Sequence, residues 1–136
     1  DDGMILVWGA LFGFISVAFG AYSEHNLRET VSDEQFRSLM TAVRYNQVNA
    51  VIICAIGLAL HLSGKLLQIR SFKWSAQSFV VGTILFSFGI YLWVLLDVQA
   101  LRYLAPIGGI VTMIAWVLLL AAGWQARRNK DADDST

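Results

Sequence analysis

The sequence contains few of the residues on which metal sites, disulfides and nucleic-acid surfaces depend. It has one cysteine, two histidines and one proline among 136 residues, and its net charge is zero. A lone cysteine, Cys54, cannot form an intrachain disulfide, and its spacing to His25 and His61 matches no metal-binding motif. A neutral chain also gives no bulk electrostatic reason to bind nucleic acid. We therefore expect no metal, no cofactor and no nucleic-acid partner.

Charged residues are missing from four long apolar runs. Asp, Glu, Lys and Arg are absent from 4–22, 45–62, 74–96 and 103–125. A helix of about 20 mainly apolar residues crosses the hydrocarbon core of a bilayer, and only helices or closed barrels satisfy their backbone groups there. The runs are long and do not alternate, so they predict helices. We predict an all-α fold: a four-transmembrane-helix bundle that forms one integral membrane domain over 1–136.

The segments outside the four runs indicate an orientation, because Lys and Arg accumulate on the cytoplasmic side of a membrane. The connection 63–73 and the C-terminal tail hold Lys65, Arg70, Lys73, Arg127, Arg128 and Lys130. The first and third connections hold fewer basic residues, diluted by acids. We predict a multi-pass protein with both termini in the cytoplasm. The small, charged tail over 129–136 predicts disorder.

The connection between the first two runs carries a helix signal. Ser32 and Gln35 fit a capping box, and apolar residues then recur at helical spacing, at Phe36, Leu39, Met40 and Val43. We predict a short amphipathic outer helix over 33–44. This helix either continues straight into the second span or bends near Tyr45 and lies along the membrane interface. We favour the bent, interfacial form.

Small residues gather on shared helix faces, where they let membrane helices approach closely. In the first span their spacing of four, three and four places them on one stripe, and further patches occur in the third and fourth spans. These candidate packing residues are Gly9, Gly13, Ser16, Gly20, Gly82, Gly89, Gly108 and Gly109. Contacts within the chain and contacts between copies both fit the pattern, and we favour the former.

Polar residues gather at the outer ends of the first two spans. The candidates are Glu24, His25, Arg44, Tyr45, Asn46 and Asn49. Buried amides in a helical bundle usually join helices by hydrogen bonds. The sharper interpretation is a pocket for a polar or lipophilic small molecule. Only Glu24 and His25 offer acid–base chemistry, and an ordinary solvated pair is the commoner case.

Several short motifs follow one another in a fixed order. They are Ala18-Phe19-Gly20-Ala21 with His25, then Tyr45, then Leu85-Phe86-Ser87 with Tyr91, then Pro106-x-Gly108-Gly109 with Trp116. This order resembles the YgdD-like family of small uncharacterised bacterial inner-membrane proteins. The resemblance implies a four-helix protein of the bacterial inner membrane and supplies no activity. Where the family has a second outer-side histidine this chain has Asn49, so we expect no His–His metal site.

The sequence contains no catalytic motif and no Asp, Glu, Lys or Arg inside the four runs, whereas transporters usually place an ionisable group in mid-membrane. We predict a non-enzymatic integral membrane protein, with no catalytic residues. It would be an accessory or interaction subunit that associates with other membrane proteins or with itself. The alternative is a small-molecule or lipid binding or transport protein with a polar site on the outer side.

Overall fold

The structure is a computed structural model that describes the backbone of residues 2–136 and the side chains from Gly3 onward. Four helical stretches in it are long and apolar enough to cross a membrane, and no strand occurs among the described residues. The prediction of an all-α, four-helix bundle is confirmed. The elements are α1 (Asp2–Tyr22), η1 (Ser23–Leu27), α2 (Asp33–Leu62), α3 (Gly64–Leu67), α4 (Arg70–Thr83), η2 (Ile84–Phe88), α5 (Gly89–Leu96), η3 (Gln99–Tyr103) and α6 (Leu104–Asp134).

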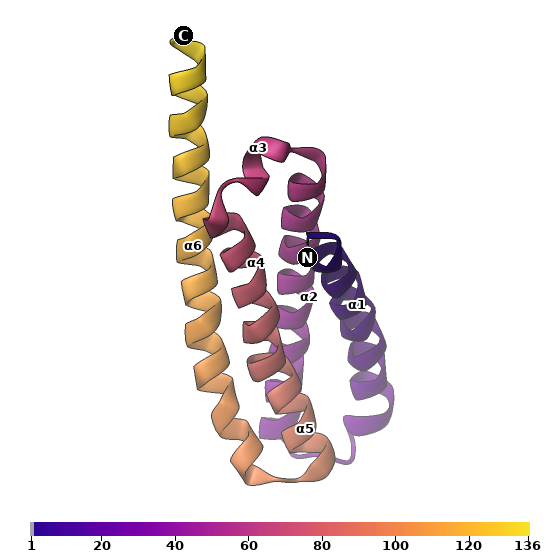
Figure 1. The fold of residues 1–136 in the computed structure, drawn as a ribbon. Helices are drawn as coiled ribbons and strands as arrows, with labels where there is room; N and C mark the ends of the chain where they lie inside the picture. Colours follow the sequence, from indigo (N-terminus) through magenta and orange to yellow (C-terminus); the bar gives the residue numbers. More distant parts are fainter. Residues whose placement is uncertain (1) are drawn as a thin grey trace.

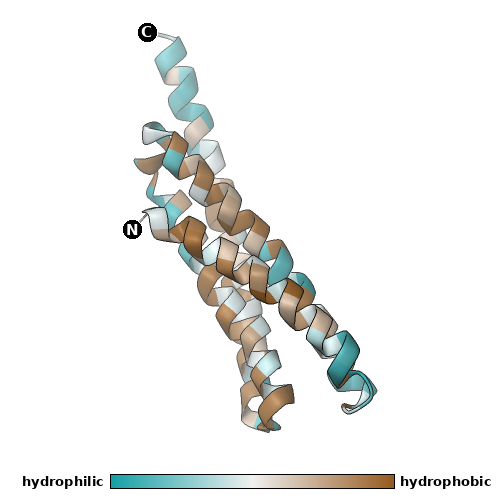
Figure 2. Ribbon diagram, turned by 90° about the vertical axis from the view of Figure 1, so that its right-hand side faces the viewer, coloured by the Kyte–Doolittle hydropathy of each residue, from teal (hydrophilic) through white to brown (hydrophobic). Residues whose placement is uncertain are grey.

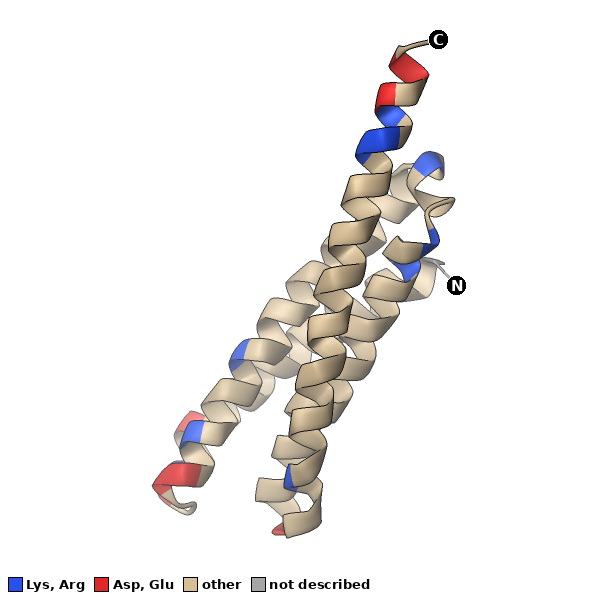
Figure 3. Ribbon diagram, turned by 90° about the vertical axis from the view of Figure 1, so that its left-hand side faces the viewer, with Lys and Arg blue, Asp and Glu red and all other residues tan. Residues whose placement is uncertain are grey.

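The bundle consists of two antiparallel helical hairpins (Figure 1). In one hairpin α1 packs along α2, and in the other the continuous stretch α4–η2–α5 packs along α6. Helix α2 joins the hairpins through contacts with α4, η2 and α5. The hairpins splay apart toward the end that carries the first and third connections (Figure 2). Charged residues gather toward the two ends (Figure 3), as a bilayer requires.

The hydrophobic core lies between α1, α2 and α4. Phe12, Ile53 and Phe79 are buried there almost completely. The ring of Phe12 also meets that of Phe88 edge-on, with centroids 5.2 Å apart. A second cluster joins the start of α2 to α5, where Leu39 packs with Trp93 and Val94.

The predicted outer helix is not separate from the second span. Helix α2 runs without a break from Asp33 to Leu62, so the bent, interfacial form that we favoured is wrong. The capping box is present: Gln35 N donates to Ser32 Oγ and Ser32 N donates to Gln35 Oε1, both at 3.1 Å. Leu39 and Ala42 are fully buried against α5. The helix stays straight because the bundle itself, and not the lipid headgroups, covers its apolar face.

The prediction of a disordered tail over 129–136 is also wrong. Helix α6 continues to Asp134 and projects well beyond the other helices (Figure 1). Alanine, arginine and lysine favour helix, and adding residues to an existing helix avoids the cost of nucleation. An exposed ion pair between Lys65 Nζ and Asp133 Oδ2, 3.0 Å long, links this segment to the connection after α2.

Glycines allow α1 and α2 to pack backbone to backbone. A Cβ atom on Gly9 would lie 2.8 Å from the backbone nitrogen of Cys54, and one on Gly57 would lie 2.9 Å from that of Leu6. Both positions therefore need glycine. Gly57 was not among the predicted packing residues, although the small residues Ala50 and Cys54 precede it by seven and three positions on the same face of the helix.

The second hairpin has the same kind of contact. A Cβ atom on Gly108 would lie 2.9 Å from the carbonyl carbon of Leu85 and would crowd Phe86 N, and Gly82 faces Thr112. The predicted packing residues Gly13, Ser16, Gly20 and Gly89 also face neighbours within the chain or are buried in it. Gly109 differs: a Cβ atom there would have nothing within 4 Å. The prediction that Gly109 packs closely is wrong for contacts within this chain.

The two adjacent glycines of α6 give a matched test. We expect Gly108→Ala to lower the free energy of unfolding by about 1–3 kcal/mol, because the added methyl group meets the backbone of η2. Gly109→Ala should leave it unchanged or raise it by up to about 1 kcal/mol, since alanine favours helix. Denaturant titration of both variants in detergent measures this difference. Equal losses would contradict the packing described here.

Candidate functional site

Polar side chains inside the bundle are the first candidate for a functional site. In the hydrocarbon layer no water is available to them, so hydrogen bonds within the protein stabilise them. Those that are at most 2% exposed are Ser16, Ser23, Asn46, Asn49, Ser75, Thr83 and Ser87. Two of these side chains donate to backbone oxygens: Ser16 Oγ donates to Gly13 O, and Ser75 Oγ donates to Ala115 O.

Three hydrogen bonds join α2 to the α4–η2–α5 stretch. Asn46 Nδ2 donates to Tyr91 Oη at 3.0 Å, and Asn49 Nδ2 donates to Thr83 Oγ1 at 3.0 Å. Ser87 Oγ donates to the backbone oxygen of Ala42 at 2.7 Å. We call Asn46, Asn49, Thr83, Ser87 and Tyr91 the polar clamp, because these side chains tie one hairpin to the other.

The π-turn η2 brings the three clamp residues of the third span to one face. Thr83, Ser87 and Tyr91 are each four residues apart, and in a regular α-helix each such step rotates the side chain by about 40°. The wider π-turn between them, at Ile84–Phe88, offsets part of this rotation. Tyr91 is held further by stacking on Phe19, with ring centroids 4.1 Å apart. Polar residues at this spacing in an apolar run are a signal that our sequence analysis overlooked.

The clamp has hydrogen-bonding capacity left over. Thr83 Oγ1 donates its own proton to Phe79 O, so it accepts from Asn49 and fixes the orientation of that amide. The side-chain oxygens of Asn46 and Asn49 are buried and have no hydrogen-bond partner among the described residues. The clamp contains no carboxylate, imidazole or thiol. Its chemistry suits helix association or a small hydrogen-bond donor, and it has no acid–base or nucleophilic pair.

The six residues of the predicted outer cluster do not form one site. Asn46 and Asn49 point into the bundle, whereas Arg44 and Tyr45 lie on its exposed face. Glu24 and His25 lie exposed on η1, and Glu24 Oε2 forms an ion pair with Arg28 Nη1 at 3.1 Å. Residues that are neighbours along α2 thus face different surroundings.

A groove between α2 and α6 is the second candidate. Its volume is about 530 Å³, and it is lined by Thr41, Tyr45, Phe86, Gly109, Thr112, Met113 and Trp116. Both threonine hydroxyls donate to carbonyls of their own helices, Thr41 to Arg37 O and Thr112 to Gly108 O. The α2–α6 groove therefore presents a mainly apolar, aromatic surface at the point where the hairpins splay.

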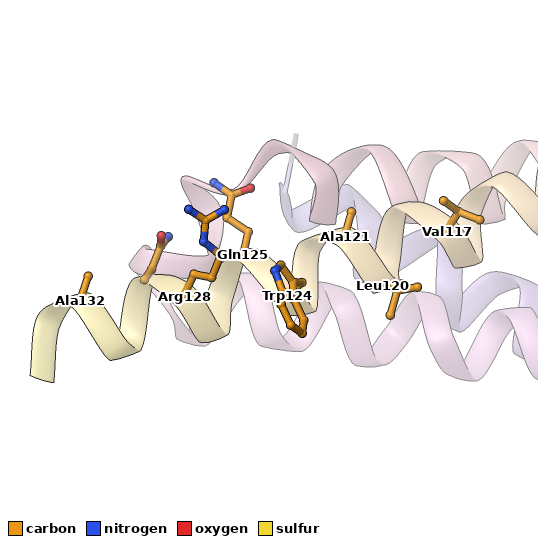
Figure 4. A pocket seen from close by; sticks show the side chains of 8 residues that line it. Val117, Leu120, Ala121, Trp124, Gln125, Arg128 and Ala132 are labelled. Carbon is orange, nitrogen blue, oxygen red and sulfur yellow. The ribbon is translucent and has the colours of Figure 1, made fainter.

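A third hollow lies along the free side of α6. It measures about 880 Å³ and is lined by Val117, Leu120, Ala121, Trp124, Gln125, Arg128, Asn129 and Ala132 (Figure 4). All of these residues belong to α6, so no other helix in the described part of the chain covers this surface. We call it the α6 face.

Comparison with known proteins decides the family. Residues 19–109 match the family model described as protein of unknown function (DUF423). The chain belongs to this family. The resemblance to YgdD-like proteins is confirmed: the UPF0382 inner membrane protein YgdD of Escherichia coli K12 is 27% identical over 124 residues, which cover 91% of this chain and 92% of that protein.

Relatives occur in other bacteria. The UPF0382 membrane protein SAB0533 of Staphylococcus aureus RF122 is 28% identical over 119 residues, covering 88% of this chain and 93% of the relative. YwdK of Bacillus subtilis 168 is 24% identical over 119 residues, covering 88% and 94%. No solved structure matches the chain. With four candidate spans and these relatives, the chain is an integral membrane protein, and the predicted inner-membrane location is supported.

The Asn46–Tyr91 bond of the polar clamp is open to a double-mutant test. We expect Tyr91→Phe to lower the free energy of unfolding by about 1–2 kcal/mol, because it leaves the buried Asn46 amide without its partner. Asn46→Leu in the same protein removes that buried amide, so the double variant should lose less than the sum of the two single losses. Unfolding in detergent measures all three, with the exposed Tyr103→Phe as control. Strictly additive losses would contradict the coupling.

Proposed function

We propose that the protein is a non-enzymatic inner-membrane subunit that associates with other membrane proteins, or with a second copy of itself, through the α6 face. The supporting observation is that, among the described residues, other helices cover only one side of the long helix α6. Its buried residues, Gly108, Ala115 and Ala122, are seven residues apart and so share one side of the helix, and α6 packs against α4 and η2. The opposite side carries large apolar residues with most of their surface exposed, such as Leu120 and Trp124.

The shape of the α6 face supports this role. Association of helices in lipid depends on close van der Waals packing, which small residues permit. Most of the small residues of the chain already serve contacts within it, but Ala121 is exposed between Val117 and Trp124 and leaves the surface hollow (Figure 4). A side chain from a neighbouring helix fits such a hollow as a knob fits a hole.

Two further parts of the proposal concern chemistry and orientation. The residues that a catalytic role would need, Glu24 and His25, are exposed, and Glu24 is engaged by Arg28. This favours a role without catalysis.

Basic residues favour the cytoplasm for both termini, because Lys and Arg accumulate on that side of a membrane. They gather at the end of the bundle that carries Lys65, Arg70 and the start of the α6 projection (Figure 3).

The second candidate function is binding of a lipid or another lipophilic molecule. The observation that favours it is the α2–α6 groove, and not the polar cluster predicted at the outer ends of the first two spans. This groove lies closer to the start of α6 than the α6 face does and shares no lining residue with it, so the two roles can be tested separately.

The association is tested with a matched pair of variants in which an exposed alanine is replaced by leucine. Ala121→Leu fills the hollow of the α6 face, and Ala21→Leu adds the same bulk to an exposed position of α1. We expect Ala121→Leu to reduce the assembled fraction about tenfold, since overpacking of an interface costs about 1–3 kcal/mol. Ala21→Leu should leave it unchanged. Native mass analysis of untagged protein, gently extracted from its own membrane, measures the assembled fraction.

The same spectra identify the partner by its mass. A stoichiometric foreign subunit supports the accessory role, and a multiple of the chain's own mass supports self-association. A wild-type protein that arrives only as a monomer would contradict the proposal, and so would an equal assembled fraction in the two variants.

A further inference from the structure

We infer that the α2–α6 groove is a binding site for an anionic phospholipid, with an acyl chain in the groove and the phosphate bound by Arg37 and Arg44. This site goes beyond the proposed association, because the α6 face lies further along α6 and shares no lining residue with the groove. The inference depends on the surface of the groove, the two arginines and their depth.

The groove suits an acyl chain. The rings of Tyr45 and Phe86 meet edge-on, with centroids 5.3 Å apart, and line the groove together with Trp116 and Met113. The hydroxyls of Thr41 and Thr112 are bonded to their own helices and demand no polar ligand. Gly109 keeps the groove open, because a side chain at that position would occupy free space. The volume of about 530 Å³ lies within the range of ligand pockets in proteins.

Two arginines lie on the face of α2 that borders the groove. Arg37, Thr41 and Arg44 are spaced four and three residues apart, so they share one side of the helix. Both arginines are exposed, and within the part of the chain that the structure describes neither forms an ion pair. The other arginines at this end differ: Arg28 pairs with Glu24, and Arg102 lies 3.8 Å from Glu34.

The hydrogen bond from Ser87 to Ala42 fixes the depth of these arginines. Ser87 is about 14 Å along the helix from Leu96, where the apolar stretch of α5 ends, at 1.5 Å per residue. Arg44 follows Ala42 by half a turn in the direction of the second span's centre, so we expect its backbone to lie below the headgroup layer. A guanidinium at that depth extends toward the interface and has a strong preference for an anionic group.

The phosphate of a phospholipid is the anion that the membrane supplies next to these arginines. The planar guanidinium binds phosphate oxygens with two parallel hydrogen bonds, and a phospholipid carries its phosphate directly above its acyl chains. Anionic lipids are favoured over zwitterionic ones because the latter bring a cation beside the two arginines. The two hairpins splay apart toward this end of the bundle (Figures 2 and 3). The groove lies between α2 of one hairpin and η2 and α6 of the other, so we expect lipid to enter it from the side.

Lipid titration followed by native mass analysis tests the site. The purified full chain in detergent is titrated with phosphatidylglycerol or with phosphatidylcholine of the same acyl chains, and protein–lipid adducts are counted. We expect wild type to prefer phosphatidylglycerol at least about fivefold. The double variant Arg37→Gln/Arg44→Gln should show a preference near one. Arg28→Gln, which removes an arginine of the same end that already has a carboxylate partner, should keep the wild-type preference.

The groove is tested by filling the free space beside Gly109. Gly109→Leu should reduce the adducts of both lipids about tenfold, whereas Ala121→Leu on the α6 face should keep them. Helical content and thermal unfolding check that each variant is folded. If Gly109→Leu does not fold, Met113→Trp fills the same groove from an exposed position.

Three results would overturn the inference. The first is equal binding of the two lipids by wild type, and the second is an unchanged preference in the double arginine variant. The third is a change of oligomeric state in Gly109→Leu with lipid adducts retained, which would mean that the groove seats a second copy of the chain. Loss of association in Ala121→Leu alone leaves the lipid site intact, so the two proposals fail separately.

Discussion

Inside a bilayer no water is available to hydrogen-bond a buried amide or hydroxyl, and this constraint organises the whole molecule. The polar clamp meets it for the amide nitrogens of Asn46 and Asn49, which donate to Tyr91 and Thr83 of the facing helix. These bonds set the register of one hairpin against the other. That register in turn decides how far Arg44 lies from the end of α5 and where the two hairpins separate. The α2–α6 groove is a consequence of this arrangement.

Within each hairpin the constraint is steric. Gly9 and Gly57 bring α1 against α2, and Gly108 brings α6 against η2 at distances that no side chain permits. The side of α6 that carries Leu120 and Trp124 is left exposed by these contacts and has no partner among the residues that the structure describes. The open side of α6 is the surface that we propose for association, and the groove beside it is the site that we propose for a lipid. Neither proposed role requires a catalytic group.

Much of the fold could be predicted from the sequence because the bilayer imposes a simple rule on length and charge. The four runs and the capping box at Ser32 depend on local chemistry and are present in the structure. The errors occurred where tertiary contacts override that chemistry. The segment 33–44 is amphipathic and suits a membrane surface, but α5 covers Leu39 and Ala42, so α2 stays straight. The tail is charged, but it extends a helix that already exists.

The sequence by itself determined that the chain spans a membrane four times, since any charge within those runs would be costly in hydrocarbon. It also determined which residues are small enough or polar enough to join helices. Only the tertiary structure decided which partner each of them meets. Gly108 and Gly109 are identical neighbours, yet one touches the backbone of η2 and the other faces the groove. Asn46 and Tyr45 are likewise adjacent, but one points inward and the other outward. A helix turns by about 100° per residue, so the packing of the hairpins, and not the local pattern, assigns each side chain its role.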